Sequence, residues 1–187
     1  MLLMKWLQRF KYLTEQLCLY TEKVTISFID LYTKISHNIK GKNIYELSYE
    51  QKNTLARYFA EIAYSHNIEI DTCAEDIDLS SYGITHARCI DDRLISKLLH
   101  CSIDIEKDKN QRLECGCIAS IDLGLYNTCQ NGCIYCYANH SYAIRKQNFE
   151  TYDPFSPLLC SNITEFDKIT ERKVKSQKNM QLSLFDI

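Results

Sequence analysis

The sequence predicts an α/β fold, either a partial parallel sheet or a fragment of a TIM-like barrel, followed by a cysteine-rich metal loop and a flexible tail. Apolar side chains recur at helical spacing over residues 2–19, which predicts an amphipathic helix. Residues 24–30 form a β-branched and aromatic run that is almost continuously apolar, as in a parallel strand covered on both faces. A helix over 49–66 and a strand over 68–72 then repeat this order. Such alternation is typical of a parallel sheet or barrel.

The composition indicates a folded protein without general affinity for nucleic acid or membranes. The 187 residues are 45% hydrophobic, enough for an apolar core, and the formal charge of −2 attracts neither polyanions nor lipid surfaces. Lys5, Arg9 and Lys11 interrupt the apolar opening, which is therefore no signal peptide, and no segment approaches a membrane span. We therefore expect a cytoplasmic protein whose ten cysteines are reduced.

Asp30 follows the first predicted strand, and Cys73 and Glu75 follow the second, where parallel folds gather their functional groups. A further cluster with His86 and Cys89 lies just before a predicted helix. Each also has a plainer interpretation, because such cysteines are often small buried hydrophobic residues and a single histidine is often structural. The candidates for a catalytic or substrate-binding role are Asp30, Cys73, Glu75, His86 and Cys89.

The remaining segments complete the predicted organisation. A helix at about 92–100 can be capped by Asp91 or Asp92. Residues 165–178 form a charged run of the kind that stays disordered or makes a loose helix. We therefore expect one α/β domain over 1–148, which includes a cysteine loop at 115–137, and a flexible tail over 149–187.

Five of the ten cysteines fall in the predicted cysteine loop. Cys129, Cys133 and Cys136 are spaced so that a short loop can direct three thiolates at one inorganic centre, and Asn131 and Gly132 supply the turn. Three thiolates with one open position favour an iron–sulfur cluster of the [4Fe-4S] type, whereas structural zinc takes four protein ligands.

The pattern Cys129-x3-Cys133-x2-Cys136, with an aromatic Tyr135 before the last cysteine, resembles the signature of the radical S-adenosylmethionine enzymes. The resemblance implies that these cysteines bind three irons of the cluster and that the fourth iron binds S-adenosylmethionine. It places Tyr135 near the adenine of this cofactor. It also implies a reductant protein that supplies the electron for forming the substrate-activating radical.

A longer part of the chain, roughly residues 10–142, resembles an uncharacterised family of bacterial and archaeal proteins whose C-terminal cysteines are likened to the radical enzyme cluster. The likeness includes the segments 26–32, 72–75, 86–91, 107–112 and 115–139. Members of that family are longer at the N-terminus, so we expect this chain to be shortened there. Only 51 residues follow Cys136, so any barrel precedes its cluster, unlike in ordinary radical enzymes.

Two further cysteines of the loop leave alternatives open. Cys115 or Cys117 can supply a fourth ligand, which would close the cluster and make it an electron carrier or a structural element. Either of them together with Cys129, Cys133 and Cys136 can instead make a four-thiolate zinc site.

The C-terminal residues suggest a docking peptide. The sequence from Gln181 to Phe185 resembles the short motif by which bacterial polymerases and repair proteins bind the sliding clamp. This resemblance implies a link to DNA maintenance. Exposed apolar side chains at a terminus usually mark an interaction, although a strand that folds onto the domain is the alternative. The docking residues are Gln181, Leu182, Leu184 and Phe185. A non-catalytic module with a structural metal, recruited through this tail, is the alternative to an enzyme.

Overall fold

The computed structural model describes residues 2–179, which divide into two compact units. We call the first the sheet unit, with residues 2–29, 46–120 and 176–179. The second, the loop unit, comprises residues 30–45 and 121–175. The predicted cysteine loop is therefore divided between them, because Cys115 and Cys117 belong to the sheet unit and Cys129 to Cys136 belong to the loop unit.

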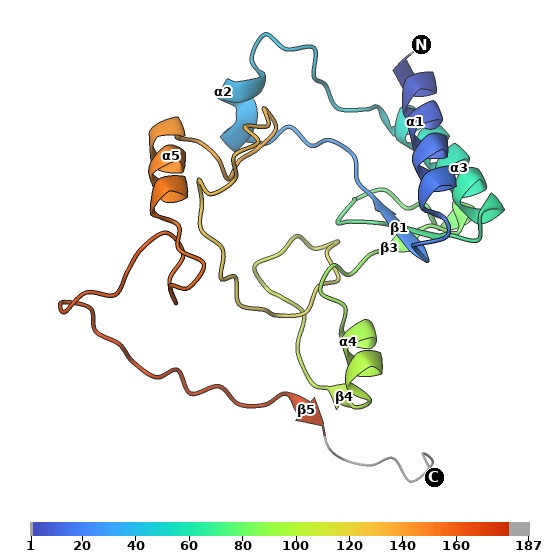
Figure 1. The fold of residues 1–187 in the computed structure, drawn as a ribbon. Helices are drawn as coiled ribbons and strands as arrows, with labels where there is room; N and C mark the ends of the chain where they lie inside the picture. The colour runs from blue at the N-terminus through green and yellow to red at the C-terminus, as the bar shows by residue number, and fades with distance from the viewer. Residues whose placement is uncertain (1, 180–187) are drawn as a thin grey trace. The chain divides into compact units, whose positions relative to one another are not determined.

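A three-stranded parallel sheet forms the centre of the sheet unit (Figure 1). Strand β1 (Lys23–Ile26) pairs with β2 (Glu69–Thr72), and β2 pairs with β3 (Thr85–His86), each in parallel. This confirms the predicted parallel sheet, and within residues 2–179 the strands close no barrel. The strand predicted over 24–30 is too long, because after Ile26 the Phe28 amide turns away to donate to the Glu75 carboxylate.

Two helices supply most of the apolar core. Helix α1 (Leu2–Leu17) lies beside α3 (Tyr49–Ser65), which packs against β2 (Figure 1). The rings of Phe10 and Phe59 stack between the helices with centroids 4.3 Å apart. Both helices confirm the sequence prediction. The buried apolar cluster comprises Ile26, Phe28, Leu55, Ala56, Phe59, Ala60, Ala63, Ile68, Ile70, Ile77, Leu79 and Ile84.

A capped helix and a small second sheet complete the sheet unit. A 3-10 helix, η2 (Ser80–Tyr82), precedes β3, and α4 (Asp92–Leu99) follows it. The Asp91 carboxylate caps α4 by accepting a hydrogen bond from the Arg93 amide at 2.9 Å, as predicted. Strand β4 (Ser102–Ile103) pairs antiparallel with β5 (Lys178–Asn179), so the charged run ends in a short strand.

The loop unit has little regular structure and almost no core. It contains a 3-10 helix, η1 (Thr33–Ile35), and two α-helices, α2 (Ser36–Ile39) and α5 (Tyr142–Thr151). Among its residues only the side chains of Ile35 and Asn127 are buried. Helix α5 was not expected from the sequence, because its apolar residues Ile144 and Phe149 form no inward-facing stripe and remain exposed.

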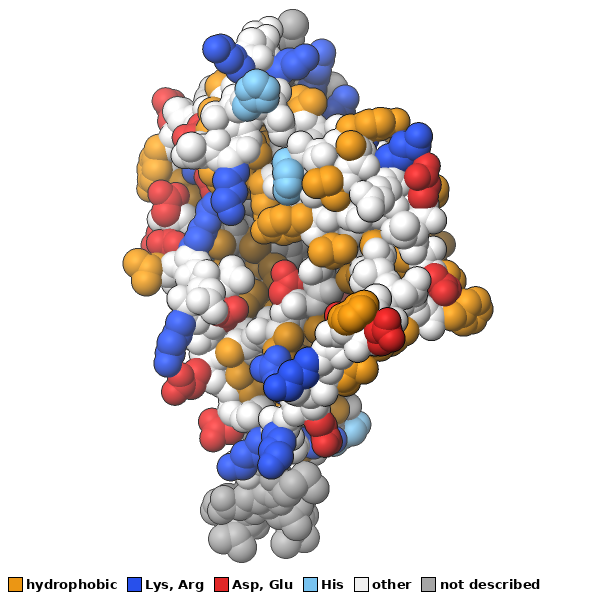
Figure 2. Space-filling view, turned by 90° about the vertical axis from the view of Figure 1, so that its left-hand side faces the viewer, with side chains coloured by type: hydrophobic (Ala, Val, Ile, Leu, Met, Phe, Trp, Pro, Cys, Tyr) orange, Lys and Arg blue, Asp and Glu red, His pale blue; other side chains and the backbone are white. Residues whose placement is uncertain are grey.

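The surface carries both signs of charge. On the face shown in Figure 2, basic and acidic side chains are interspersed with hydrophobic ones, and neither sign dominates. No helix among residues 2–179 has the length and apolar character needed to cross a membrane.

The cap of α4 makes a prediction for stability and its pH dependence. Replacing Asp91 by Ala should cost about 1 kcal/mol in urea unfolding at neutral pH, because α4 loses its cap. The Arg93 side chain lowers the pKa of Asp91 to about 2. A carboxylate with a depressed folded-state pKa stabilises fully above its ordinary pKa of 3.8 and loses that contribution as pH falls toward 2.

The matched control is Asp91→Asn, which keeps an oxygen acceptor for the cap and removes the titrating group. It should retain most of the neutral-pH stability while showing a smaller loss on acidification. Equal stability of Asp91→Ala and the wild type would show that this cap does not support the fold.

Candidate metal centre

The cysteines of the loop unit lie on an irregular turn. Cys129 and Cys133 are exposed and Cys136 is half-buried, and none of them is in a disulfide. Gly132 has φ of +62°, the left-handed conformation that the predicted turn requires. The Asn131 amide donates to Cys129 Sγ at 3.5 Å, and the Cys136 amide donates to the Cys133 carbonyl at 3.1 Å.

A buried asparagine closes the base of this turn. Asn127 is only 4% exposed, and its Oδ1 accepts hydrogen bonds from the amides of His140 and Ser141, both at 2.9 Å. The backbone amide of Asn127 donates to the Ala138 carbonyl at 2.9 Å. These bonds join the two ends of the segment 127–141, so the cysteines are carried on a closed loop.

Tyr135 is fixed through its hydroxyl group. The hydroxyl donates to the Asp30 carbonyl at 2.8 Å, accepts from the Asp30 amide at 3.1 Å and lies 2.8 Å from the Tyr32 hydroxyl. The rings of Tyr32 and Tyr135 lie 5.6 Å apart. Asp30, a candidate catalytic residue, therefore meets Tyr135 through its backbone. The ring of Tyr135 is thus held in place beside the cysteines that precede and follow it.

A cavity of about 290 Å³ lies beside Cys133. Its lining is formed by Asn38, Gly132, Cys133, Ile134, Asn139, His140, Ser141, Tyr142 and Arg145.

Arg145 lines this cavity and carries one buried, unsatisfied donor. Its guanidinium lies over the Tyr142 ring at 5.2 Å, and a Cβ built on Gly132 would come within 3.2 Å of Nη1. Its Nε is buried and has no hydrogen-bond partner among the described residues. A guanidinium in the lining of a cavity is suited to an anionic ligand group.

The donor set has the right chemistry for a thiophilic centre, since three reduced cysteines lie on one closed loop. The three thiols do not surround a common point as metal ligands would. Within residues 2–179, no three His, Cys, Asp or Glu side chains are gathered to hold a metal ion. The thiols must therefore turn inward for a cluster to bind, as is usual where metal binding and folding are coupled.

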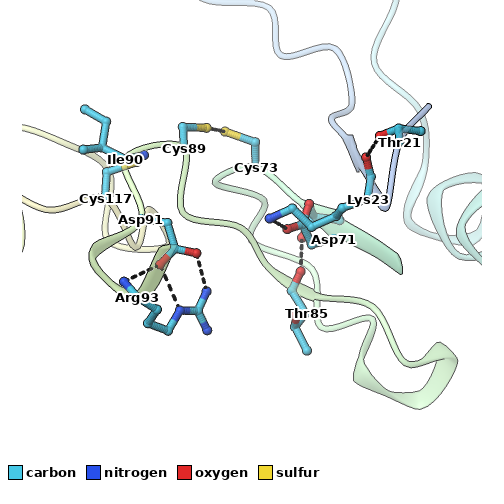
Figure 3. A network of polar contacts seen from close by, with 11 residues as sticks. Thr21, Lys23, Asp71, Cys73, Thr85, Cys89, Ile90, Asp91, Arg93 and Cys117 are labelled. Carbon is cyan, nitrogen blue, oxygen red and sulfur yellow. Dashed lines mark hydrogen bonds and ion pairs between the residues drawn. The ribbon is translucent and has the colours of Figure 1, made fainter. Parts of the chain in front are cut away.

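Two of the candidate residues in the sheet unit touch each other. Cys73 follows β2 and Cys89 follows β3, and their sulfurs are 3.5 Å apart (Figure 3). The hydrogen bond with Cys73, aided by burial, raises the pKa of Cys89 to about 11. Parallel neighbours end at the same edge of the sheet, which explains why these two cysteines meet.

Cys115 and Cys117 are buried next to this pair. Burial raises the pKa of Cys115. For Cys117, burial is outweighed by the Ile90 amide, which donates to its sulfur at 3.4 Å, and by the Cys115 thiol, so its pKa is lowered. Figure 3 shows Cys117 beside Ile90. The Ile90 amide thus links Cys117 to the segment that carries Cys89.

Glu75 and His86 have different surroundings. Glu75 is 3% exposed and its Oε1 accepts from the Phe28 amide at 2.7 Å and from the Ser27 hydroxyl at 2.9 Å. Its Oε2 lies 3.8 Å from Lys52 Nζ. Glu75 therefore holds the chain after β1, whereas His86 is exposed at the end of β3.

Sequence reasoning missed Asn127 and Arg145. Asn127 has a φ of +60°, which is a conformation that asparagine tolerates, but a single asparagine gives no such signal in the sequence. Arg145 lies on α5, whose weak amphipathicity gave no sign of a helix, so the sequence did not place this arginine near the cysteines.

Comparison with protein-family models gives one match. Residues 3–138 match the family described as Domain of unknown function (DUF1848). The chain belongs to the DUF1848 family. No curated protein and no solved structure matches it.

The DUF1848 match confirms the resemblance to an uncharacterised family. It includes all five cysteines between 115 and 136 as well as Cys73 and Cys89. Helix α5, with Arg145, and the tail lie beyond the matched residues. The thiols are thus part of the DUF1848 domain of this chain.

The contacts of Glu75 predict a role in stability. Glu75→Ala should lower the free energy of unfolding by about 1–3 kcal/mol, because it leaves the buried Phe28 amide without an acceptor. Glu75→Gln keeps one oxygen acceptor and should cost less. Urea unfolding of the two variants checks this order, and a destabilised Gln variant beside an unaffected Ala variant would contradict it.

Proposed function

We propose that this chain is an iron–sulfur protein in which Cys129, Cys133 and Cys136 hold a [4Fe-4S] cluster. The observation that carries the proposal is the near absence of a core in the loop unit, where only Ile35 and Asn127 are buried. A unit of roughly 70 residues with so little buried apolar surface needs another source of stability, such as a metal centre.

The closed loop supports a cluster at this position. Asn127 ties both ends of the segment 127–141, so the three thiols cannot drift far apart. Three thiolates on one short loop favour a cluster with an open iron over structural zinc, which takes four protein ligands. Zinc held with Cys115 or Cys117 is the alternative metal.

We further propose that the open iron binds S-adenosylmethionine, by the resemblance to radical enzymes. The cluster, when reduced, would supply the electron that cleaves this cofactor, and a reductant protein would be the electron source. Within the chain, the Tyr135 ring would lie near the adenine. The guanidinium of Arg145, which lines the cavity beside Cys133, would bind the carboxylate of the cofactor.

Two parts of the proposal concern the setting of the protein. We place it in the cytoplasm, where reducing conditions keep all ten cysteines free, as they are in the structure. The docking residues Gln181, Leu182, Leu184 and Phe185 lie outside the described residues. Sliding-clamp binding, and with it a non-catalytic module that docks on a partner, stays a prediction.

Loss of one ligand should remove the cluster. Anaerobically purified wild type should contain about four iron atoms per chain in the site, and Cys133→Ala should contain almost none. Iron and sulfide analysis measures this. Cys160→Ala in the loop unit and Cys18→Ala in the sheet unit are the controls, and both should keep their iron. Full iron content in Cys133→Ala would exclude Cys133 as a ligand.

Arg145 tests cofactor binding separately from the cluster. Arg145→Ala should weaken S-adenosylmethionine binding about 10- to 100-fold while leaving the iron content unchanged, because it removes a charge-assisted hydrogen bond. The electron paramagnetic resonance signal of the reduced cluster, titrated with the cofactor, reports the affinity.

The matched control is Lys146→Ala, which removes an exposed positive charge from the next position of α5. Its affinity should equal that of the wild type. If Arg145→Ala binds the cofactor as tightly as Lys146→Ala does, the carboxylate is not held by Arg145.

A further inference from the structure

Four thiols of the sheet unit lie in a row, which we call the thiol row. The sulfurs of Cys73 and Cys89 are 3.5 Å apart. Cys117 lies near both Cys89 and Cys115, since the thiols of these two cysteines help to lower its pKa. All four cysteines of the thiol row belong to the sheet unit, whereas Cys129 to Cys136 belong to the loop unit.

Backbone contacts hold the three segments of the thiol row together. The Cys73 amide donates to the Ile26 carbonyl at 3.0 Å, which fixes it directly after the sheet. The Ile118 amide donates to the Ile90 carbonyl at 3.3 Å, and the Ile90 amide donates to Cys117 Sγ at 3.4 Å. The segments that carry Cys89 and Cys117 therefore lie against each other.

Gly116 allows this close approach. A Cβ at position 116 would come within 2.8 Å of Arg88 Cγ, closer than side chains pack. Glycine between Cys115 and Cys117 thus lets both thiols reach the segment of Cys89.

The spacing of the sulfurs identifies the chemistry. At 3.5 Å, Cys73 and Cys89 are too far apart for a disulfide, whose sulfurs are bonded at about 2.05 Å. Four thiolates around one zinc ion at about 2.3 Å form a tetrahedron with edges of about 3.8 Å. In a [4Fe-4S] cluster each thiolate binds a different iron, so its ligands stand farther apart. The distance favours a single ion.

We propose that Cys73, Cys89, Cys115 and Cys117 bind one zinc ion, at a structural site independent of the proposed cluster. As placed, the thiols form a row and not a tetrahedron, in keeping with the absence of a metal-holding group among residues 2–179. Zinc binding closes the row by side-chain rotation as the metal displaces the thiol protons. The ion would then tie the ends of β2 and β3 to the segment 115–118.

Metal analysis of two full-length variants tests the proposal. One carries Cys129→Ala, Cys133→Ala and Cys136→Ala, and should lose iron but keep one zinc per chain. The other carries Cys73→Ser and Cys89→Ser, and should lose zinc but keep its iron. Cys101→Ser, a half-buried cysteine of the same unit, is the matched control and should keep both metals. If the wild type holds no iron, the proposed cluster is wrong, but the zinc content of the variants still tests the zinc site.

A second measurement does not depend on the folding of a variant. Equimolar zinc added to metal-free wild type should protect four of the ten cysteines from alkylation, and mass spectrometry should map them to the thiol row. Protection confined to Cys129, Cys133 and Cys136 would overturn the proposal. So would a Cys73–Cys89 disulfide that forms readily in air in the presence of zinc, since it would mark the pair as a redox couple.

Discussion

The loop unit must fold with almost no apolar burial. Residues 30–45 and 121–175 enclose the side chains of Ile35 and Asn127 and leave others, such as Phe155 and Phe166, about 90% exposed. The hydrophobic effect scales with the apolar area removed from water, so it contributes little to this unit. Polar contacts organise the unit, chiefly the hydrogen bonds by which Asn127 closes the segment 127–141 and those of the Tyr135 hydroxyl. The three cysteines lie on the loop that Asn127 closes, where a metal centre would add the stability that apolar burial does not provide.

The sheet unit is built on the opposite principle. Its two long helices cover a small parallel sheet with a continuous apolar cluster, so apolar burial stabilises its fold. Its thiols come together because successive parallel strands end at one edge. Cys73 and Cys89 meet there, and Glu75 fixes the chain nearby by accepting the Phe28 amide. With a cluster in the loop unit and zinc in the sheet unit, the chain would hold two sulfur sites of different kinds.

Hydrophobic periodicity predicted the elements that form the core and missed β3 and α5. The helices at 2–17 and 49–65 carry strong patterns because each buries one face. The strand at 69–72 is covered on both faces, with three consecutive residues buried. Strand β3 has only two residues and α5 buries no side chain, so neither leaves a pattern to read. The three cysteines of the loop were visible from their spacing. Asn127 and Arg145 act through tertiary contacts, and such contacts are not encoded by local spacing.

A metal centre that takes the place of a core in the loop unit would make the folding of that unit depend on the metal. Hydrogen–deuterium exchange of the full chain, with iron and sulfide reconstituted or removed by a chelator, measures this dependence. Amides of residues 121–151 should be protected only when the metal is bound, while those of α3 and β2 should be protected in both states. Equal protection of residues 121–151 without metal would contradict the proposed role of the cluster, because the loop unit would then fold by itself.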